Sequence, residues 1–200
     1  MPTVKKYYAY ILPSGEQGIV DAWPACQKLV SGKPNARYKG FTTEANAQAW
    51  LATGGDYAAK HVANSGIYFD AGTGRGDGVE ISVTDETGAD LLQEILPTQK
   101  INRHGKHLIQ KDVSNNFGEL LACRYALELA LKRGVMHVFG DSKLIIDYWS
   151  KGYINVPNVT RETLELASRV ADLRKEFEAA GGRIEHISGD DNPADLGFHK

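Results

Sequence analysis

The sequence predicts an α/β domain built on a mixed five-stranded sheet with flanking helices, preceded by a small α+β domain of ββαβα order. Two observations support this prediction. The first fifty residues alternate short strand-like and helix-like segments, and a polar, glycine-containing stretch at 54–65 follows them. From residue 66, three strand-like segments precede alternating helices and strands, which is typical of a mixed sheet. We therefore expect domains at 1–53 and 66–200, joined by a linker at 54–65.

The N-terminal domain is predicted from local patterns. Its first segment is rich in aromatic and β-branched side chains, and a turn-forming run of Pro, Ser and Gly follows it. Trp23, Cys26, Leu29 and Val30 then recur at helical spacing. The expected elements are strands at 4–12, 19–20 and 35–41, and helices at 21–30 and 43–51, the second capped by Thr42 or Thr43.

In the second domain, glycines and turn residues punctuate the pattern. Gly134 closes one long helix-like segment, and a Gly-Gly pair closes another. A turn at 85–88 separates two strand-like segments, which predicts a hairpin. Residues 98–113 are predicted to be a solvated connection. We expect strands at 66–70, 79–84, 89–96, 135–139 and 183–188, and helices at 117–133, 142–150 and 160–180.

Composition favours a globular protein of the cytoplasm. The chain has 200 residues, 42% of them hydrophobic, and no apolar run approaches the ~20 residues of a membrane span. The N-terminus lacks the apolar core of a signal peptide. Cys26 and Cys123 have no metal or redox spacing and are expected to be buried, reduced thiols. No obligate protein partner is evident.

Charge is unevenly distributed along the chain. Residues 1–53 contain six basic and three acidic residues, a net +3, whereas the remainder contains 17 basic and 22 acidic residues, a net −5. Phosphate binding requires clustered Lys and Arg, and the overall net charge of −2 gives no such signature. The basic front and the acidic remainder suggest that the two domains have separate tasks.

Four acidic residues occupy informative positions in the second domain. Asp70 and Asp141 each follow a predicted strand, Glu119 lies in the first turns of a helix, and Asp195 follows Asn-Pro-Ala near the C-terminus. Loops at the C-terminal ends of parallel strands are the usual place of function in open α/β sheets. Carboxylates gathered there, without clustered cysteine or histidine, suit Mg²⁺.

Taken singly, each acid has a plain structural interpretation. Asp141 could cap a helix, and Glu119 could complement a helix dipole. A lone aspartate after a strand, such as Asp70, is most often a turn residue. The functional hypothesis therefore depends on all four residues together.

In order and spacing, these motifs resemble the four-carboxylate signature of type 1 ribonucleases H over about residues 66–200. The resemblance implies a ribonuclease H-like sheet and identifies Asp70, Glu119, Asp141 and Asp195 as metal-binding carboxylates. The matching strings are Tyr68-Phe69-Asp70-Ala71-Gly72-Thr73, Asn115-Asn116-Phe117-Gly118-Glu119-Leu120, Asp141-Ser142-Lys143 and Asn192-Pro193-Ala194-Asp195.

The N-terminal domain resembles the hybrid-binding (viroplasmin-like) domain of the same family. The resemblance implies that Trp23 and Tyr38 pack against the DNA strand of an RNA–DNA hybrid, while Tyr8 and Lys39 meet phosphates. Aromatic faces beside a basic groove suit nucleic-acid contact. The alternative is that Trp23 and Tyr38 form the core of a very small domain. The matching residues are Tyr7-Tyr8-Ala9, Trp23, Cys26, Gly32, the run from Ala36 to Phe41, and Ala49-Trp50.

By this resemblance the chain is a hybrid-specific endoribonuclease that uses two Mg²⁺ ions, with Mn²⁺ as a possible substitute, and leaves 5′-phosphate and 3′-hydroxyl ends. Selection of RNA requires contacts to the 2′-hydroxyl, which the family places near Asn116, Glu119 and the loop after Asp70. Ser114 and Asn115 could hold a DNA phosphate, or the asparagines could simply cap a helix beginning at Phe117. The remaining expected substrate contacts are Ser142 and Lys143, where Lys143 replaces a common glutamine.

The sequence departs from the family before the fourth carboxylate. A histidine common in this loop is absent, and the loop reads Ser188-Gly189-Asp190-Asp191. Asp191 could lie near the second metal ion, or it could be a solvated turn residue. His199 is an auxiliary candidate for substrate contact, and His186 is expected to be structural. Two rival functions stay open: a non-catalytic hybrid-binding protein, and another nuclease on the same fold.

Overall fold

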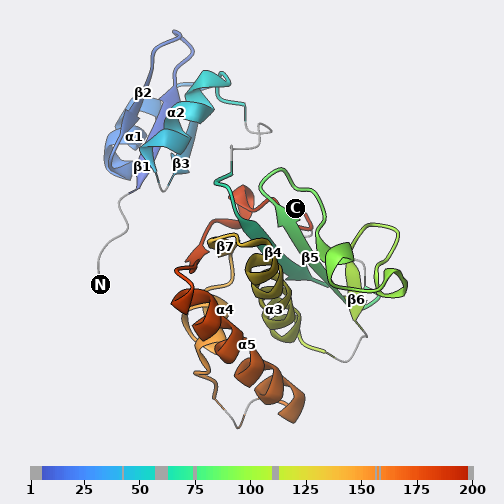
Figure 1. Ribbon diagram of the computed structural model, residues 1–200. Coiled ribbons are helices and arrows are strands. Elements are labelled where there is room, and N and C mark those ends of the chain that lie inside the picture. Colours follow the sequence, from blue (N-terminus) through green and yellow to red (C-terminus); the bar gives the residue numbers. More distant parts are fainter. Residues whose placement is uncertain are drawn as a thin grey trace. The chain divides into compact units, whose positions relative to one another are not determined.

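The computed structural model describes residues 6–41, 43–56, 63–73, 76–109, 113–155, 157 and 159–197. Contacts divide the chain into two compact units, Met1–Val62 and Ala63–Lys200 (Figure 1). The predicted linker at 54–65 stays a prediction, and its residues 57–62 lie outside the described ranges. Within those ranges, no helix combines the length and the apolar character that a bilayer crossing requires.

The first unit has the predicted ββαβα order. Its three strands form an antiparallel sheet in the order β2-β1-β3, and Tyr8 of β1 lies opposite Val20 on one side and Gly40 on the other. Thr43 caps the second helix by accepting a hydrogen bond from the Asn46 amide. The elements are β1 (Tyr7–Ile11), β2 (Gln17–Val20), α1 (Trp23–Val30), β3 (Arg37–Phe41) and α2 (Glu44–Ala52).

One helix covers each face of this small sheet, because successive strand residues point to opposite faces. Tyr10 packs with Cys26 and Val30 of α1. Its neighbour Ala9 packs on the other face with Trp50 of α2. The unit therefore has two small apolar clusters, one on each side of the sheet.

The second unit contains the predicted mixed five-stranded sheet. The strand order is β6-β5-β4-β7-β8, with antiparallel pairing from β6 to β4 and parallel pairing from β4 to β8. Within the described residues, the short 3₁₀ turns η1, η2, η3 and η5 accompany the main elements. These are β4 (Ile67–Gly72), β5 (Val79–Asp85), η1 (Leu92–Glu94), η2 (Thr98–Lys100), β6 (His107–Ile109), α3 (Asn115–Arg133), β7 (His137–Gly140), α4 (Lys143–Asp147), η3 (Trp149–Lys151), α5 (Arg161–Ala179), β8 (Arg183–His186) and η5 (Gly189–Asp191).

The position of the fifth strand differs from the prediction. Segment 89–96 makes only an isolated bridge, Thr84 to Asp90, and then turns into η1, because Leu91 and Leu92 are buried in the core. The edge strand is instead β6, inside the segment predicted to be a solvated loop. Asn102 closes that segment into a turn by accepting hydrogen bonds from the amides of His104 and Lys106.

The main core lies between the sheet and α3. Ile67, Phe69 and Ala71 of β4 point into it, together with apolar residues of α3 and α5. Tyr68 and Phe139 point to the opposite face, where Ala194 of the C-terminal segment packs against them. The C-terminal segment therefore covers part of the sheet face opposite α3.

Candidate metal centre and nucleic-acid interface

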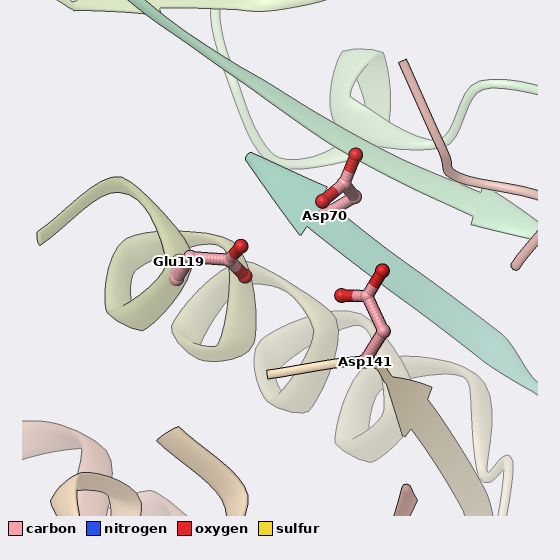
Figure 2. A group of neighbouring side chains, drawn as sticks. All are labelled: Asp70, Glu119 and Asp141. Atoms are coloured by element: carbon pink, nitrogen blue, oxygen red, sulfur yellow. The ribbon is translucent and has the colours of Figure 1, made fainter. Parts of the chain in front are cut away.

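Three of the four predicted carboxylates meet at one place in the second unit. Asp70 comes from β4, Glu119 from the second turn of α3, and Asp141 directly follows β7 (Figure 2). Each offers an oxygen atom, and the three oxygens lie within 4.8 Å of one another. The side chains of Asp70 and Glu119 are buried, and that of Asp141 is partly buried.

The sheet pairing explains why the two aspartates lie side by side. Parallel pairing between β4 and β7 covers only Ile67 with Val138 and Tyr68 with Phe139. Asp70 and Asp141 lie just beyond that pairing, at the C-terminal ends where parallel strands meet. Asp70 was predicted at the C-terminal end of its strand. β4 continues past it to Gly72, because β4 goes on pairing with β5, where Asp70 faces Ser82.

Gly118 allows Glu119 to approach the sheet. A side-chain Cβ at position 118 would lie 2.3 Å from Cγ1 of Val79 and 3.2 Å from Cβ of Ala71. Without a side chain there, α3 packs directly on β4 and β5. The carboxylate of the next residue, Glu119, is therefore held near the aspartates.

The environment of these acids favours their protonated forms when no cation is bound. Burial, reinforced by the charges of Asp141 and Asp195, raises the pKa of Asp70 to about 7, although the Leu196 amide opposes the shift. Burial and the charges of Asp70 and Asp141 raise the pKa of Glu119 to about 9. Burial also raises the pKa of Asp141, against the charge of His186 and a hydrogen bond from the Asn192 side chain. Like charges thus meet in a poorly solvated place.

The chemistry of the three acids fits Mg²⁺. All the ligand atoms are carboxylate oxygens, which hard divalent cations prefer. Oε2 of Glu119 is buried and has no hydrogen-bond partner among the described residues. A buried carboxylate oxygen without a partner is costly unless a cation completes it. Asp70, Glu119 and Asp141 are therefore the residues that could hold the metal.

The simple structural interpretations of Asp141 and Glu119 do not describe this geometry. Ser142, not Asp141, occupies the N-cap position of α4, and it makes no side-chain capping bond. Glu119 is buried against the sheet, with like charges as its neighbours, and so does not serve the helix dipole at the surface. Lys143, the first residue of α4, is exposed to solvent.

The other predicted acids lie outside the group of three. Asp195 is exposed on the C-terminal segment, where its Oδ1 accepts a hydrogen bond from the Gly197 amide at 2.9 Å. It lies near enough for its charge to raise the pKa of both Asp70 and Asp141. Asp191 ends η5 and is partly buried. His199 lies outside the described residues.

Residues of the C-terminal segment that were not predicted as site residues contact the aspartates. The Leu196 amide donates to Oδ2 of Asp70 at 3.1 Å. Nε2 of His186 lies 3.0 Å from the carbonyl oxygen of Asp141. Asn192, whose side chain is buried, bonds to the backbone next to Asp70. Its place in the Asn-Pro-Ala-Asp string was the one sequence signal that could have marked it.

The start of α3 settles which residue caps this helix. The helix begins at Asn115, not Phe117, and Oγ of Ser114 accepts a hydrogen bond from the Phe117 amide at 3.2 Å. The capping residue is therefore Ser114, and neither asparagine is the cap. A cavity of about 480 Å³ lies here between the starts of α3 and α5. It is lined by Val113, Ser114, Asn116, Phe117, Trp149, Asn155, Val159, Thr160, Glu162 and Thr163.

In the first unit, three aromatic side chains form a row at the surface. Ring centroids are 5.7 Å apart for Tyr8 and Trp23, and 5.4 Å apart for Trp23 and Tyr38. Trp23 is 36% exposed and Tyr38 is 43% exposed. The alternative that Trp23 and Tyr38 form the domain core is therefore wrong, since Trp50 and Phe41 have that position.

Lys39 is not part of the face that carries this row. Tyr38 and Lys39 are consecutive in β3, so their side chains point to opposite faces of the sheet. Nζ of Lys39 lies 5.8 Å above the ring of Phe41, on the face that α2 covers. The structure therefore brings Tyr8, Trp23 and Tyr38 together and leaves Lys39 apart from them.

Two solved structures are similar to this chain. One is the crystal structure of RNase H1 from the halophilic archaeon Halobacterium salinarum NRC-1, with 20% identity and a TM-score of 0.39 over 62% of this chain and 85% of that one. The other is the N-terminal RNase H domain of a Mycobacterium tuberculosis protein, solved as a fusion with maltose-binding protein. It has 21% identity and a TM-score of 0.40 over 63% of this chain and 83% of that one.

No curated protein matches the chain. The model of the family described as the Ribonuclease H1 N-terminal domain matches residues 6–51, which include all five elements of the first unit except the last residue of α2. This match confirms the resemblance seen in the N-terminal sequence. Residues 6–51 of the first unit are thus similar to the Ribonuclease H1 N-terminal domain family.

Proposed function

We propose that the chain is an endonuclease that hydrolyses the RNA strand of RNA–DNA hybrids with the help of two Mg²⁺ ions. The observation that carries this proposal is the buried group of Asp70, Glu119 and Asp141, in a chain whose first unit matches the hybrid-binding domain family. Mn²⁺ would be a substitute ion, because it also accepts carboxylate ligands.

The reaction requires no protein nucleophile. Water attacks the phosphorus atom, the bond from phosphorus to the 3′-oxygen breaks, and the products have 5′-phosphate and 3′-hydroxyl ends. When bound, Mg²⁺ supplies Lewis acidity to the phosphate and to the attacking water. Asp70, Glu119 and Asp141 would hold the ions in place, and Asp195 would complete their ligands from the C-terminal segment.

Recognition of RNA requires a contact to the 2′-hydroxyl, which DNA lacks. Asn116 is the second residue of α3 and Glu119 is the fifth. These two residues are our candidates for that contact. Ser114, which lines the cavity at the start of α3, and its neighbour Asn115 would hold a phosphate of the DNA strand. Ser142 and Lys143, next to Asp141, would contact the strand that is cut, with Asp191 and His199 as auxiliary contacts.

The first unit would grip the hybrid through its aromatic row. Trp23 and Tyr38 present exposed rings that can pack against the sugars and bases of the DNA strand. The Tyr8 hydroxyl would meet a phosphate at the end of the row. A phosphate contact by Lys39 would have to come from the other face of the sheet.

The test compares hydrolysis of a labelled hybrid by the wild-type chain and by Asp70→Asn, with Mg²⁺ and with EDTA. Asp172→Asn, an identical change at a side chain that is 74% exposed on α5, is the matched control. We expect Asp70→Asn to lower the rate of hybrid hydrolysis by more than about 100-fold, the upper end of what is typical for changes around a metal site. We expect the control to cut like wild type.

The substrates separate the rival functions. Wild-type activity on double-stranded DNA or single-stranded RNA equal to that on the hybrid would indicate another nuclease. Tight hybrid binding without metal-dependent cutting would indicate a binding protein. Full activity of Asp70→Asn would refute the proposed site.

A further inference from the structure

The C-terminal segment is bonded to both strands that carry the aspartates. The Ile187 amide donates to the carbonyl oxygen of Gly140 at 2.9 Å, immediately before Asp141. The Leu196 amide donates to the carboxylate of Asp70 at 3.1 Å. Between these two contacts lies Asn192, whose side chain is only 6% exposed. A buried amide must satisfy its hydrogen bonds within the protein.

Asn192 satisfies them with groups of both strands. Its Nδ2 donates to the carbonyl oxygen of Phe69, the residue before Asp70, at 3.0 Å. Its Oδ1 accepts from the Ala194 amide at 3.0 Å. The Asn192 side chain also acts on the Asp141 carboxyl, whose pKa it lowers against the effect of burial. The Phe69 carbonyl and an ionised Asp141 carboxylate are both acceptors, and the two hydrogens on the amide nitrogen allow it to serve both.

The backbone pairing of β4 with β7 does not hold Asp70 and Asp141 together. The parallel pairing of β4 and β7 stops at Tyr68 and Phe139, so the ladder does not hold Asp70 against Asp141. The two carboxylates also repel each other. The C-terminal backbone comes very close, since a Cβ at Gly189 would lie 3.0 Å from Oδ2 of Asp141. Asn192 therefore links Asp70 and Asp141 at a level where the pairing of β4 with β7 has already ended.

We propose that Asn192 is a positioning residue that holds Asp70 and Asp141 at the separation at which they bind a divalent cation together. Its loss weakens cation binding, while the chemical step at saturating cation is largely kept. This inference rests on the proposed function for the identity of the ligand. It assigns to Asn192 no contact with substrate or cation, only with the residues that hold the cation.

Two variants test it in the full chain. Asn192→Asp keeps the side-chain volume and the acceptor for the Ala194 amide, but it removes both donors and adds a like charge. Asn192→Ser keeps a short acceptor and adds no charge. The control is Asn64→Asp, the same change at an exposed residue of the second unit. Far-UV circular dichroism and unfolding midpoints in EDTA report whether each variant folds.

The direct readout is Mn²⁺ binding without substrate, measured by the loss of the free-ion electron paramagnetic resonance signal, with Mg²⁺ as competitor. We expect Kd to rise about 10- to 100-fold in both variants, the range typical of groups that orient metal ligands. The Mg²⁺ concentration for half-maximal hydrolysis should rise in parallel. The kcat at saturating Mg²⁺ should stay within about threefold of wild type, and the control should match wild type throughout.

The outcomes separate this inference from the proposed function. A wild-type chain that neither binds Mn²⁺ nor cuts hybrid overturns the proposed function, and with it the ligand assumed here. A wild-type chain that does both, beside a folded variant whose Kd is unchanged, overturns the role of Asn192 alone. A lower unfolding midpoint with unchanged Kd, in whichever variant folds, also overturns it, because that result describes a purely structural residue.

Discussion

Asp70→Asn should stabilise the metal-free protein at alkaline pH. Asp70 is 5% exposed, and its pKa rises from 3.8 when unfolded to about 7 in the folded chain, chiefly through burial. Folding therefore takes up a proton between these two pKa values. The stability of the wild-type chain is full below about pH 4 and falls as pH rises towards about 7. Asparagine is uncharged, fills the same space, and can still accept the hydrogen bond from the Leu196 amide.

The size of the effect follows from the two pKa values. With a difference of about 3 pKa units, ionisation of Asp70 lowers the free energy of unfolding by about 4 kcal/mol at pH 8, but by only about 0.5 kcal/mol at pH 4. The value at pH 8 is a ceiling, because a real site relaxes and admits water around a buried charge. We expect a gain of about 2 kcal/mol for Asp70→Asn at pH 8 in EDTA and almost none at pH 4.

Urea unfolding of the full chain measures this gain. Circular dichroism at the helix band reports mainly the second unit, whose α3 and α5 have 19 residues each. Adding Mg²⁺ at 100 times its Kd should stabilise the wild type by about 2.7 kcal/mol and the variant much less, so that the advantage of the variant disappears. A variant no more stable than wild type at pH 8 in EDTA, or one with the same gain at both pH values, would refute the reasoning.

Two further predictions concern the nucleic-acid contacts. Ser114→Ala should cost about 1 kcal/mol of stability by removing the cap of α3, whereas Ser114→Asp should keep the cap and weaken hybrid binding through repulsion of a phosphate. Unfolding midpoints and hybrid titrations check both variants. Unchanged hybrid binding by Ser114→Asp would contradict the proposed contact between Ser114 and a phosphate. Tyr38→Ala should weaken hybrid binding by about 1–3 kcal/mol without changing kcat at saturating hybrid. Filter-binding and steady-state assays measure the two quantities, and a fall in kcat alone would contradict the surface role of the aromatic row.

Sequence patterns predicted the acid group because the signals were local. Asp141 was placed at the end of a buried strand, and that is where it lies. Glu119 was placed near the start of a helix, and it lies near the start of α3. What the patterns could not supply was pairing: the extension of β4 through Asp70 depends on β5, and the edge strand β6 depends on a partner far along the chain. The spacing of apolar residues in 89–96 is typical of a strand, but in the structure this segment forms the 3₁₀ turn η1 with Leu92 buried.

One pattern in the sequence separates Tyr38 from Lys39. Tyr38 and Lys39 are neighbours in a predicted strand, and alternation alone places them on opposite faces. The expectation that both would face one hybrid groove conflicts with that alternation. Asn192 is the opposite case, since its partners Phe69 and Ala194 are 123 and two residues away and only the fold reveals the first.

The charge distribution indicates why the two units would work better together. The second part of the chain carries a net −5, and its metal-free centre gathers three acids, so it has little attraction for a polyanion. The N-terminal part carries a net +3 and an exposed aromatic row, and under the proposed function it would bind a hybrid without any cation. Divalent cations at Asp70, Glu119 and Asp141 would remove the repulsion at the centre. Cation binding and hybrid binding at that centre should then favour each other, because each offsets the charge that opposes the other.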